Sequence, residues 1–179
     1  MIGKLFTESM QAPIDFENIS AEDFRFAIVV ARWNGDLTSK LESGAAEALA
    51  KAGTPRNAVE IFRVPGAFEL PLAAMKAAET GLFDAVIALG VIIRGETPHF
   101  DYVASQASAG IMQASLDTGI PVMFGVVTAD TREQAEARCG GSVGNKGSEA
   151  AMSAIEMANL AREIEGLIEG DDRVFPHVV

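Results

Sequence analysis

The stretch AVIALGVII at residues 85–93 is the longest nearly continuous apolar run of the chain. Apolar and polar residues do not alternate along it, which is typical of a strand buried on both faces of a parallel sheet. It has less than half of the ~20 residues that a membrane-spanning helix needs, so it does not indicate an integral membrane protein. The stretch therefore predicts an α/β domain built on a parallel sheet.

Three shorter apolar runs and four helical patterns flank this stretch. The runs are FAIVVA at 26–31, AVEIFR at 58–63 and VMFGVV at 122–127. The alternation of strand and helix indicates right-handed βαβ crossovers in a doubly wound sheet. The helix stripes comprise Leu37, Leu41, Ala45, Ala48 and Ala52; Phe68, Leu72, Met75 and Glu79; Phe100, Val103, Ala107, Ile111 and Ala114; and, in a final helix over residues 148–167, Met152, Ile155, Ala158 and Arg162.

The composition is that of one folded domain with an acidic surface. The 179 residues are 49% hydrophobic, and 14 basic against 25 acidic residues give a net charge of −11. This balance gives no general reason to bind nucleic acid or anionic lipid. The lone Cys139 excludes an internal disulfide and a cysteine-based zinc cage and suits a reducing cytoplasm, and the N-terminus does not resemble a secretory signal. We expect one domain at residues 21–168, an N-terminal arm at 1–20 and a C-terminal tail at 169–179.

The segment RGETPHF at residues 94–100 is the first candidate site, because ligands bind outside the carboxyl ends of the strands in an open α/β sheet. Thr97 is a suitable N-cap and Pro98 suits the first helical position, which places His99 in the first turn. The positive end of the helix dipole there favours a neutral imidazole that can take or relay a proton. Gly95 and the free amides of the helix start offer a phosphate site. A plain helix start with His99 as a boundary residue is the alternative.

A glycine-rich segment, GGSVGNKG at residues 140–147, leads into the final helix. It is not a nucleotide-triphosphate loop, because Asn145 stands where that pattern needs a glycine before the lysine. Arg138 before it is suited to a bidentate grip on phosphate, and Lys146 to supplying a point charge. The alternative is a helix–helix connection with solvated basic side chains.

Two aromatic side chains follow the first two predicted strands. Trp33 offers a flat face for a heterocycle, and Phe68 precedes Glu69 at a helix start where backbone donors are free. A lone tryptophan such as Trp33 is more often a core residue, and core packing explains Phe68 equally well. The carboxylate of Glu69 in an apolar turn, by contrast, needs a partner. Cys139 is interpreted as a small hydrophobic residue.

Five motifs together point to a known family. They are ARWN at 31–34, VPGAFELP at 64–71, GVIIRGETPHFDYV at 90–103, FGVVTADT at 124–131 and GNKGSEAAMSAIEMANL at 144–160. In this order they resemble lumazine synthase, over about residues 24 to 160. The resemblance implies a flavodoxin-like, three-layer α/β/α fold with a four-stranded parallel sheet.

The resemblance also implies an assembly and a reaction. The assembly is a homopentamer in which the N-terminal arm adds a strand to the sheet of a neighbouring subunit. Whether pentamers build an icosahedral shell of sixty subunits, and whether a riboflavin synthase is enclosed, stays open. The reaction condenses 5-amino-6-(D-ribitylamino)uracil with 3,4-dihydroxy-2-butanone 4-phosphate and releases phosphate and water, with no cofactor and no metal.

Individual side chains take roles by the same resemblance. His99 is similar to the catalytic proton donor and acceptor, and Glu96 and Thr97 hold the butanone phosphate with Arg138 of the neighbouring subunit, the second catalytic residue. The implied ribitylaminouracil contacts are Trp33 on the pyrimidine face, Ala67, Phe68 and Glu69 along the ribityl chain, Val91, Ile92 and Ile93 at the uracil edge, Asn34 and Lys146 in support, and Phe124 of the neighbouring subunit.

The chain departs from the family pattern at three positions. Trp33 stands where phenylalanine is usual, Ala137 where many members have glutamate, and Ser142 where many have lysine. The missing lysine implies weaker binding of the phosphate substrate rather than lost activity. Two other interpretations stay open, a non-catalytic flavin- or lumazine-binding module and a shell-forming scaffold. His99 together with Arg138 favours the enzyme, because a storage protein needs no proton relay beside a phosphate clamp.

Overall fold

The computed structural model describes residues 20–169. The predicted arm and tail therefore lie, apart from one residue each, outside the described part of the chain. In the described part, no helix is both long and apolar enough to cross a membrane. The elements are β1 (Phe26–Ala31), α1 (Gly35–Lys51), η2 (Arg56–Ala58), β2 (Val59–Val64), η3 (Ala67–Glu69), α2 (Leu70–Glu79), β3 (Ala85–Ile93), α3 (His99–Thr118), β4 (Val122–Ala129), α4 (Arg132–Arg138), β5 (Cys139–Gly141), β6 (Gly144–Asn145) and α5 (Lys146–Glu169).

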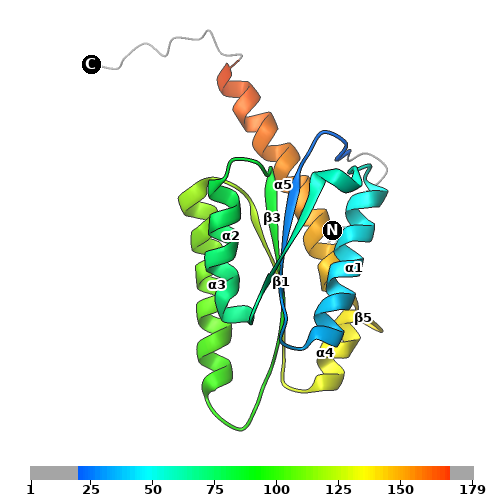
Figure 1. Cartoon of the computed structure of the whole chain (residues 1–179), viewed down its shortest axis with the longest axis vertical. Helices are drawn as coiled ribbons and strands as arrows, with labels where there is room; N and C mark the ends of the chain where they lie inside the picture. Colours follow the sequence, from blue (N-terminus) through cyan, green and yellow to red (C-terminus); the bar gives the residue numbers. More distant parts are fainter. Residues whose placement is uncertain (1–19, 170–179) are drawn as a thin grey trace, which may run out of the picture.

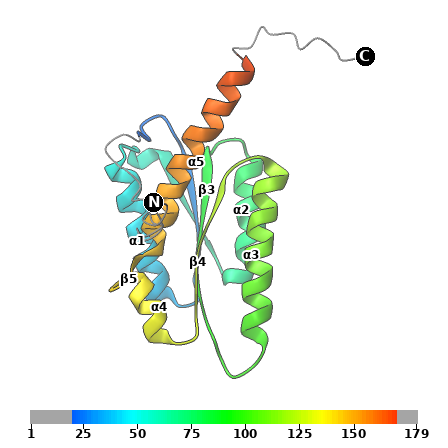
Figure 2. The ribbon, with the colours of Figure 1, turned by 180° about the vertical axis from the view of Figure 1, so that it is seen from behind.

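The four long strands form one parallel sheet in the order β2–β1–β3–β4. Helices α1 and α5 cover one face and α2 and α3 cover the other, which makes three layers (Figures 1 and 2). The predicted flavodoxin-like α/β/α fold is therefore confirmed. β1 and β3 have the predicted bounds, β2 is shifted by one residue, and β4 extends two residues further.

Burial on both faces explains why the strand sequences do not alternate. Along β1, Phe26 and Ile28 belong to the core beneath α1 and α5, whereas Ala27 and Val29 belong to the core beneath α2 and α3. Every residue of β1 is buried. The edge strand β2 differs, because its side chains from Glu60 to Arg63 are exposed.

The predicted buried stripe of α2 is wrong. Phe68 and Leu72 are 57% and 62% exposed, and the buried side chains of this helix are Leu70, Ala74, Ala77 and Ala78. The physical reason is close packing: a Cβ on Gly110 of α3 would lie 2.7 Å from the Cβ of Pro71, so the two helices meet through small side chains. The larger apolar residues of α2 are thereby turned outward.

The other stripes are largely confirmed. Ala107, Ile111 and Ala114 of α3 are buried, and the five predicted residues of the first helix are buried as well. The final helix begins at Lys146, two residues earlier than predicted. Its Arg162 is half-exposed rather than core, with its guanidinium 3.8 Å from the centroid of the Phe24 ring.

Candidate functional site

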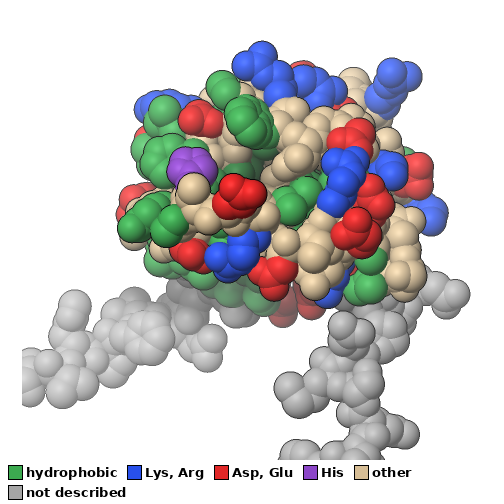
Figure 3. Space-filling view, turned by 90° about the horizontal axis from the view of Figure 1, so that it is seen from below, with side chains coloured by type: hydrophobic (Ala, Val, Ile, Leu, Met, Phe, Trp, Pro, Cys, Tyr) green, Lys and Arg blue, Asp and Glu red, His purple; other side chains and the backbone are tan. Residues whose placement is uncertain are grey.

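A cavity of about 390 Å³ opens at the carboxyl ends of β1, β2 and β3. The register of β1 with β3 ends at Val30 and Leu89, and the chain then turns away from β3. A gap of this kind, between strands whose connections run to opposite faces, is where parallel α/β sheets bind ligands. Figure 3 views the molecule from this end, and hydrophobic side chains gather on its left half. The lining residues are Trp33, Asn34, Pro65, Gly66, Ala67, Phe68, Glu69, Val91, Ile92, Ile93, Gly95, Thr97, His99, Phe100 and Val103.

Trp33 and Asn34 form the wall that follows β1. The Trp33 side chain is 74% exposed and free to present its ring to a ligand, so it is not a core residue. Asn34 has φ 56°, and it is the only non-glycine residue with positive φ in the described range. Its Nδ2 donates a hydrogen bond of 2.9 Å to the carbonyl of Val91 in β3.

The segment after β2 forms the opposite wall. Ala67, Phe68 and Glu69 make a short 3₁₀ turn, in which the side chain of Phe68 is exposed. The Glu69 carboxylate accepts a hydrogen bond of 2.9 Å from the amide of Gly66. The partner that this carboxylate needs is therefore an amide of its own loop, which rigidifies the cavity wall.

The third wall is the start of α3, where one prediction is corrected. His99 lies in the first helical turn as predicted, but Thr97 is not the N-cap: Pro98 takes that position and no side chain caps the helix. The first hydrogen bond of this helix start runs from the Asp101 amide to the Pro98 carbonyl, at 3.0 Å. Thr97 consequently stays in the loop, where it lines the cavity.

Four predicted site residues do not line the cavity of a single chain. Glu96 lies in the loop between two lining residues, and Phe124 is 45% exposed on the edge strand β4. Arg138 ends α4, and its Nη1 donates to the carbonyl of Gln134 at 2.9 Å. Lys146 begins α5 and pairs with Glu149.

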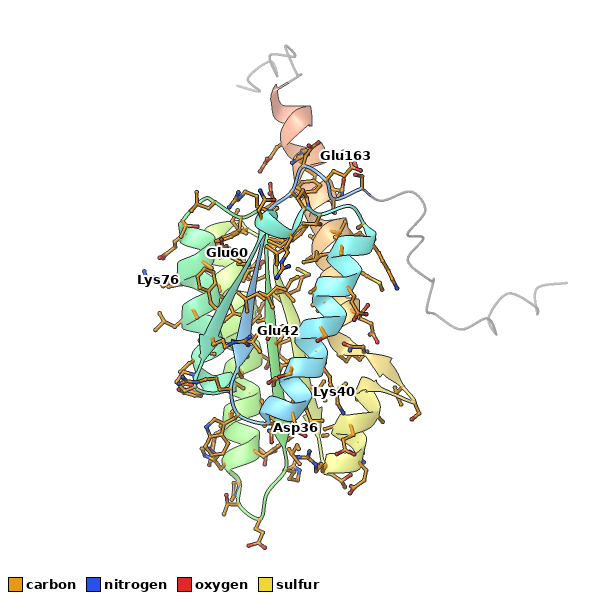
Figure 4. The ribbon with its side chains drawn as sticks, turned by 45° about the vertical axis from the view of Figure 1, so that its right-hand side comes forward. Asp36, Lys40, Glu42, Glu60, Lys76 and Glu163 are labelled. Carbon is orange, nitrogen blue, oxygen red and sulfur yellow. The ribbon has the colours of Figure 1, made fainter. Side chains whose placement is uncertain are left out.

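Contacts with α1 hold the segment around Arg138 on the α1 and α5 side of the sheet. Arg132 of α4 pairs with Asp36 near the start of α1, and Asn145 donates from Nδ2 to the carbonyl of Lys40 at 2.9 Å. Figure 4 labels Asp36 and Lys40 on the half of α1 that lies beside α4. This segment is therefore packed away from the cavity of its own chain.

Sequence reasoning missed the contacts of Arg94, which directly follows β3. Its Nε donates to Asp130 at 2.8 Å, its Nη1 and Nη2 reach Asp101 at 3.2 and 3.0 Å, and its guanidinium carbon lies 4.1 Å from the Phe100 ring centroid. The hydrogen bonds with Asp101 and Asp130 raise the pKa of Arg94 above its ordinary value. No local pattern connects these residues, because they lie on three different elements.

Two further features concern groups of metal-ligating side chains and Cys139. Across residues 20–169, no group of three or more His, Cys, Asp or Glu side chains is placed to hold a metal ion. Cys139 is fully buried, and burial raises the pKa of its thiol, as its interpretation as a small hydrophobic residue predicts. The backbone amides at the start of α3 can bind an anion.

The fold and the cavity define a class of protein. It is a flavodoxin-like α/β protein with a cavity at the switch point of its sheet, lined by an aromatic ring, strand backbone and an imidazole. The chain belongs to the 6,7-dimethyl-8-ribityllumazine synthase family, whose model matches residues 23–162.

Curated relatives agree with this membership. A protein named 6,7-dimethyl-8-ribityllumazine synthase from Desulfatibacillum aliphaticivorans is 53% identical over 147 residues, which cover 82% of this chain and 95% of the relative. A protein of the same name from Chlorobium luteolum is 53% identical over 146 residues, covering 82% and 94% respectively. The family identified from the motifs is therefore confirmed, and with it the enzyme class, since lumazine synthases are transferases.

Proposed function

We propose that this chain catalyses the condensation of 5-amino-6-(D-ribitylamino)uracil with 3,4-dihydroxy-2-butanone 4-phosphate to 6,7-dimethyl-8-ribityllumazine, a step of riboflavin biosynthesis in the cytoplasm. The observation that carries the proposal is the cavity itself, which is lined by Trp33, by the end of β3 and by His99 in a chain of this family. Phosphate and water leave in the reaction, and no cofactor or metal takes part.

The uracil substrate binds across the gap between β1 and β3. Trp33 stacks on the pyrimidine, and the end of β3 at Val91, Ile92 and Ile93 lies along the uracil edge. Successive strand residues direct their backbone groups to opposite edges, so the peptide groups of Val91 and Ile93 face the same side. Since Asn34 occupies the Val91 carbonyl, the amide and carbonyl of Ile93 are the groups at this edge that we assign to the substrate.

The remaining walls hold the polar chains of the two substrates. Ala67, Phe68 and Glu69 bind the ribityl chain, with Asn34 and Lys146 in support. Glu96 and Thr97, with the amides at the start of α3, hold the phosphate of the butanone. The helix amides contact this anion directly, whereas salt screens the more distant acidic side chains. The amides therefore favour the anion in spite of the chain's net charge of −11.

The chemistry needs proton transfer and close approach of two substrates. The 5-amino group of the uracil attacks the ketone carbon, and His99 moves protons as the carbinolamine loses water to form an imine. Arg138 stabilises the phosphate as it leaves. Ring closure and the final dehydration depend mainly on holding the substrates face to face, so positioning supplies most of the acceleration.

A neighbouring subunit completes this site. Arg138 and Phe124 lie outside the cavity of their own chain, and both side chains are accessible to a second copy. We therefore propose a homopentamer in which each cavity receives Arg138 and Phe124 from the adjacent subunit and the arm at residues 1–20 pairs with the neighbour's sheet. An icosahedral shell, with or without an enclosed riboflavin synthase, is a further assembly of the same pentamers.

The test mixes the purified protein with both substrates and follows phosphate release together with the fluorescence of the product. We expect both signals for the native chain and a loss of about 10²-fold or more in kcat for His99→Ala. Gln113→Ala, on the exposed face of α3 about four turns further along, serves as a matched control and keeps its activity. Binding of lumazine without phosphate release would instead support the non-catalytic binding module.

A further inference from the structure

Arg94 stands at the junction of the sheet and the His99 helix. We infer that its guanidinium positions His99, by holding the loop at residues 95–98 and the first turn of α3 against the ends of β3 and β4. The inference rests on the proposed function, because it assigns Arg94 to the placement of the proton relay. Arg94 itself is not among the cavity-lining residues, so it acts through His99 rather than on substrate.

The loop at residues 95–98 has few restraints of its own. Within the described part of the chain, no hydrogen bond involves Gly95, Glu96 or Thr97. The backbone amide of Arg94 donates to the Ala129 carbonyl at 2.9 Å, which is the last rung between β3 and β4 before this loop. The loop is therefore anchored at its two ends only, and its geometry depends on what holds those ends together.

The Arg94 side chain makes that connection. It reaches across the loop to the two residues that directly follow His99, stacking 4.1 Å above the Phe100 ring and binding both oxygens of Asp101. Its Nε is held at 2.8 Å by Asp130, which follows β4. One planar group thus joins β3, the end of β4 and the first turn of α3, a task suited to the forked donors of arginine rather than to a lysine ammonium.

These contacts govern local geometry more than global stability. The side chains of Arg94, Asp101 and Asp130 are 42%, 59% and 67% exposed, and ion pairs with such exposure contribute little to the free energy of unfolding. Loss of the guanidinium should therefore leave the fold intact. A shift of about 1 Å in a catalytic group can nevertheless lower the rate by about 10²-fold.

The chain offers a matched control at the opposite end of the sheet. Arg162 also stacks on a phenylalanine ring, 3.8 Å above Phe24, and lies 3.8 Å from the carboxylate of Asp84. Its side chain is 52% exposed, similar to that of Arg94. Arg162→Met therefore removes the same kind of interaction at a position outside the cavity lining.

The experiment compares Arg94→Met, Arg94→Lys and Arg162→Met in steady-state kinetics and in backbone hydrogen exchange of the full-length protein. For Arg94→Met we expect kcat to fall about ten- to hundredfold and KM for the butanone phosphate to rise. KM for the ribitylaminouracil should change less than about twofold, because its contacts lie on the walls after β1 and β2 and on the backbone of β3, which the sheet holds without the Arg94 side chain. Arg94→Lys should recover part of kcat, and Arg162→Met should behave as the native protein.

Hydrogen exchange decides the inference independently of turnover. In Arg94→Met the hydrogen-bonded amides at residues 101–103 should exchange faster by at least about fivefold, with the thermal midpoint close to that of Arg162→Met. Unchanged exchange at these amides, or equal increases in both KM values together with a lowered midpoint, would overturn the positioning role. A native protein without turnover would count against the proposed function, and the exchange result would still decide the role of Arg94.

Discussion

The side-chain amide of Asn34 donates to the carbonyl of Val91 at 2.9 Å and so replaces a missing rung between β1 and β3. The two strands remain in register only as far as Val30 and Leu89, after which the amide of Trp33 turns to the carbonyl of Pro65 beside β2. Asn34 reaches back to β3 from a left-handed conformation, with φ 56°. The Asn34 side chain thereby joins the segment after β1 to β3 at the base of the cavity. The two segments stay apart beyond this hydrogen bond, where the cavity lies.

Substitutions at Asn34 should separate the hydrogen bond from the backbone conformation. Asn34→Gly loses the bond but tolerates the positive φ, so we expect a loss of about 1 kcal/mol in the free energy of unfolding. Asn34→Ala loses the bond and adds a strained backbone, for a total of about 2 to 3 kcal/mol. Urea denaturation at one fixed protein concentration measures both, and an alanine variant as stable as the glycine variant would contradict this account.

Two glycines of α5 should respond in opposite ways to the same substitution. A Cβ on Gly147 would lie 2.0 Å from the carbonyl oxygen of Leu41, whereas a Cβ on Gly166 meets nothing within 4 Å. Gly147→Ala must push α5 away from α1, so we expect a loss of about 3 kcal/mol or more, or no folded protein. Gly166→Ala should gain up to about 1 kcal/mol from helix propensity. Denaturation midpoints of the two variants test the close approach, and equal midpoints would speak against it.

Cys139 should be unreactive in the folded protein. Burial raises the pKa of its thiol, so at pH 8 the group is protonated as well as inaccessible. Alkylation by iodoacetamide at pH 8 should be slow in the native state and fast in urea. Rapid native labelling would show that β5 opens readily.

The same thiol has a consequence for stability at alkaline pH. Because the folded pKa lies above the unfolded value, the contribution of Cys139 is present below the unfolded pKa and is lost as pH rises through the folded one. We expect the stability of the native chain relative to Cys139→Ala to decline above about pH 9. A stability difference that does not change with pH would contradict the assigned shift.

A lysine at position 142 should strengthen phosphate binding. Ser142 is exposed in the turn between β5 and β6, four residues after Arg138, at the position where the family resemblance implies a lysine. We expect Ser142→Lys to lower the dissociation constant of inorganic phosphate about fivefold, equivalent to about 1 kcal/mol. Asn57→Lys makes the same change in net charge at an exposed position of η2 and should leave the constant unchanged. Equal effects of the two variants would indicate only a general charge effect.

Much of the fold could be predicted because a strand that is buried on both faces has an unbroken apolar sequence. The runs that became β1 and β3 contain only apolar residues and glycine, and their bounds are those predicted. The face of α2 could not be derived in the same way. Its buried residues are mostly alanines, and only the proximity of Gly110 and Pro71 decides which side of the helix approaches α3.

The candidate site likewise contains residues that the sequence could predict and residues that it could not. Trp33, Glu69 and His99 could be proposed from sequence because each follows a strand whose carboxyl end meets the cavity. The roles of Phe124 and Arg138 came from the family resemblance alone, since a site shared between subunits leaves no pattern within one chain. The contacts of Arg94 could not be predicted, because Asp130 comes near it only through the pairing of β3 with β4, and Asp101 only through the turn into α3.

The central claim is that His99 of one subunit and Arg138 of its neighbour act in the same cavity. Coexpression of His99→Ala with Arg138→Ala tests it, because each variant supplies what the other lacks. Each variant alone should be nearly inactive, whereas random mixed assemblies should regain about a quarter of the native turnover, from the cavities that pair an intact His99 with an intact Arg138. Turnover no higher than that of either variant alone, in assemblies shown to be mixed, would contradict the account.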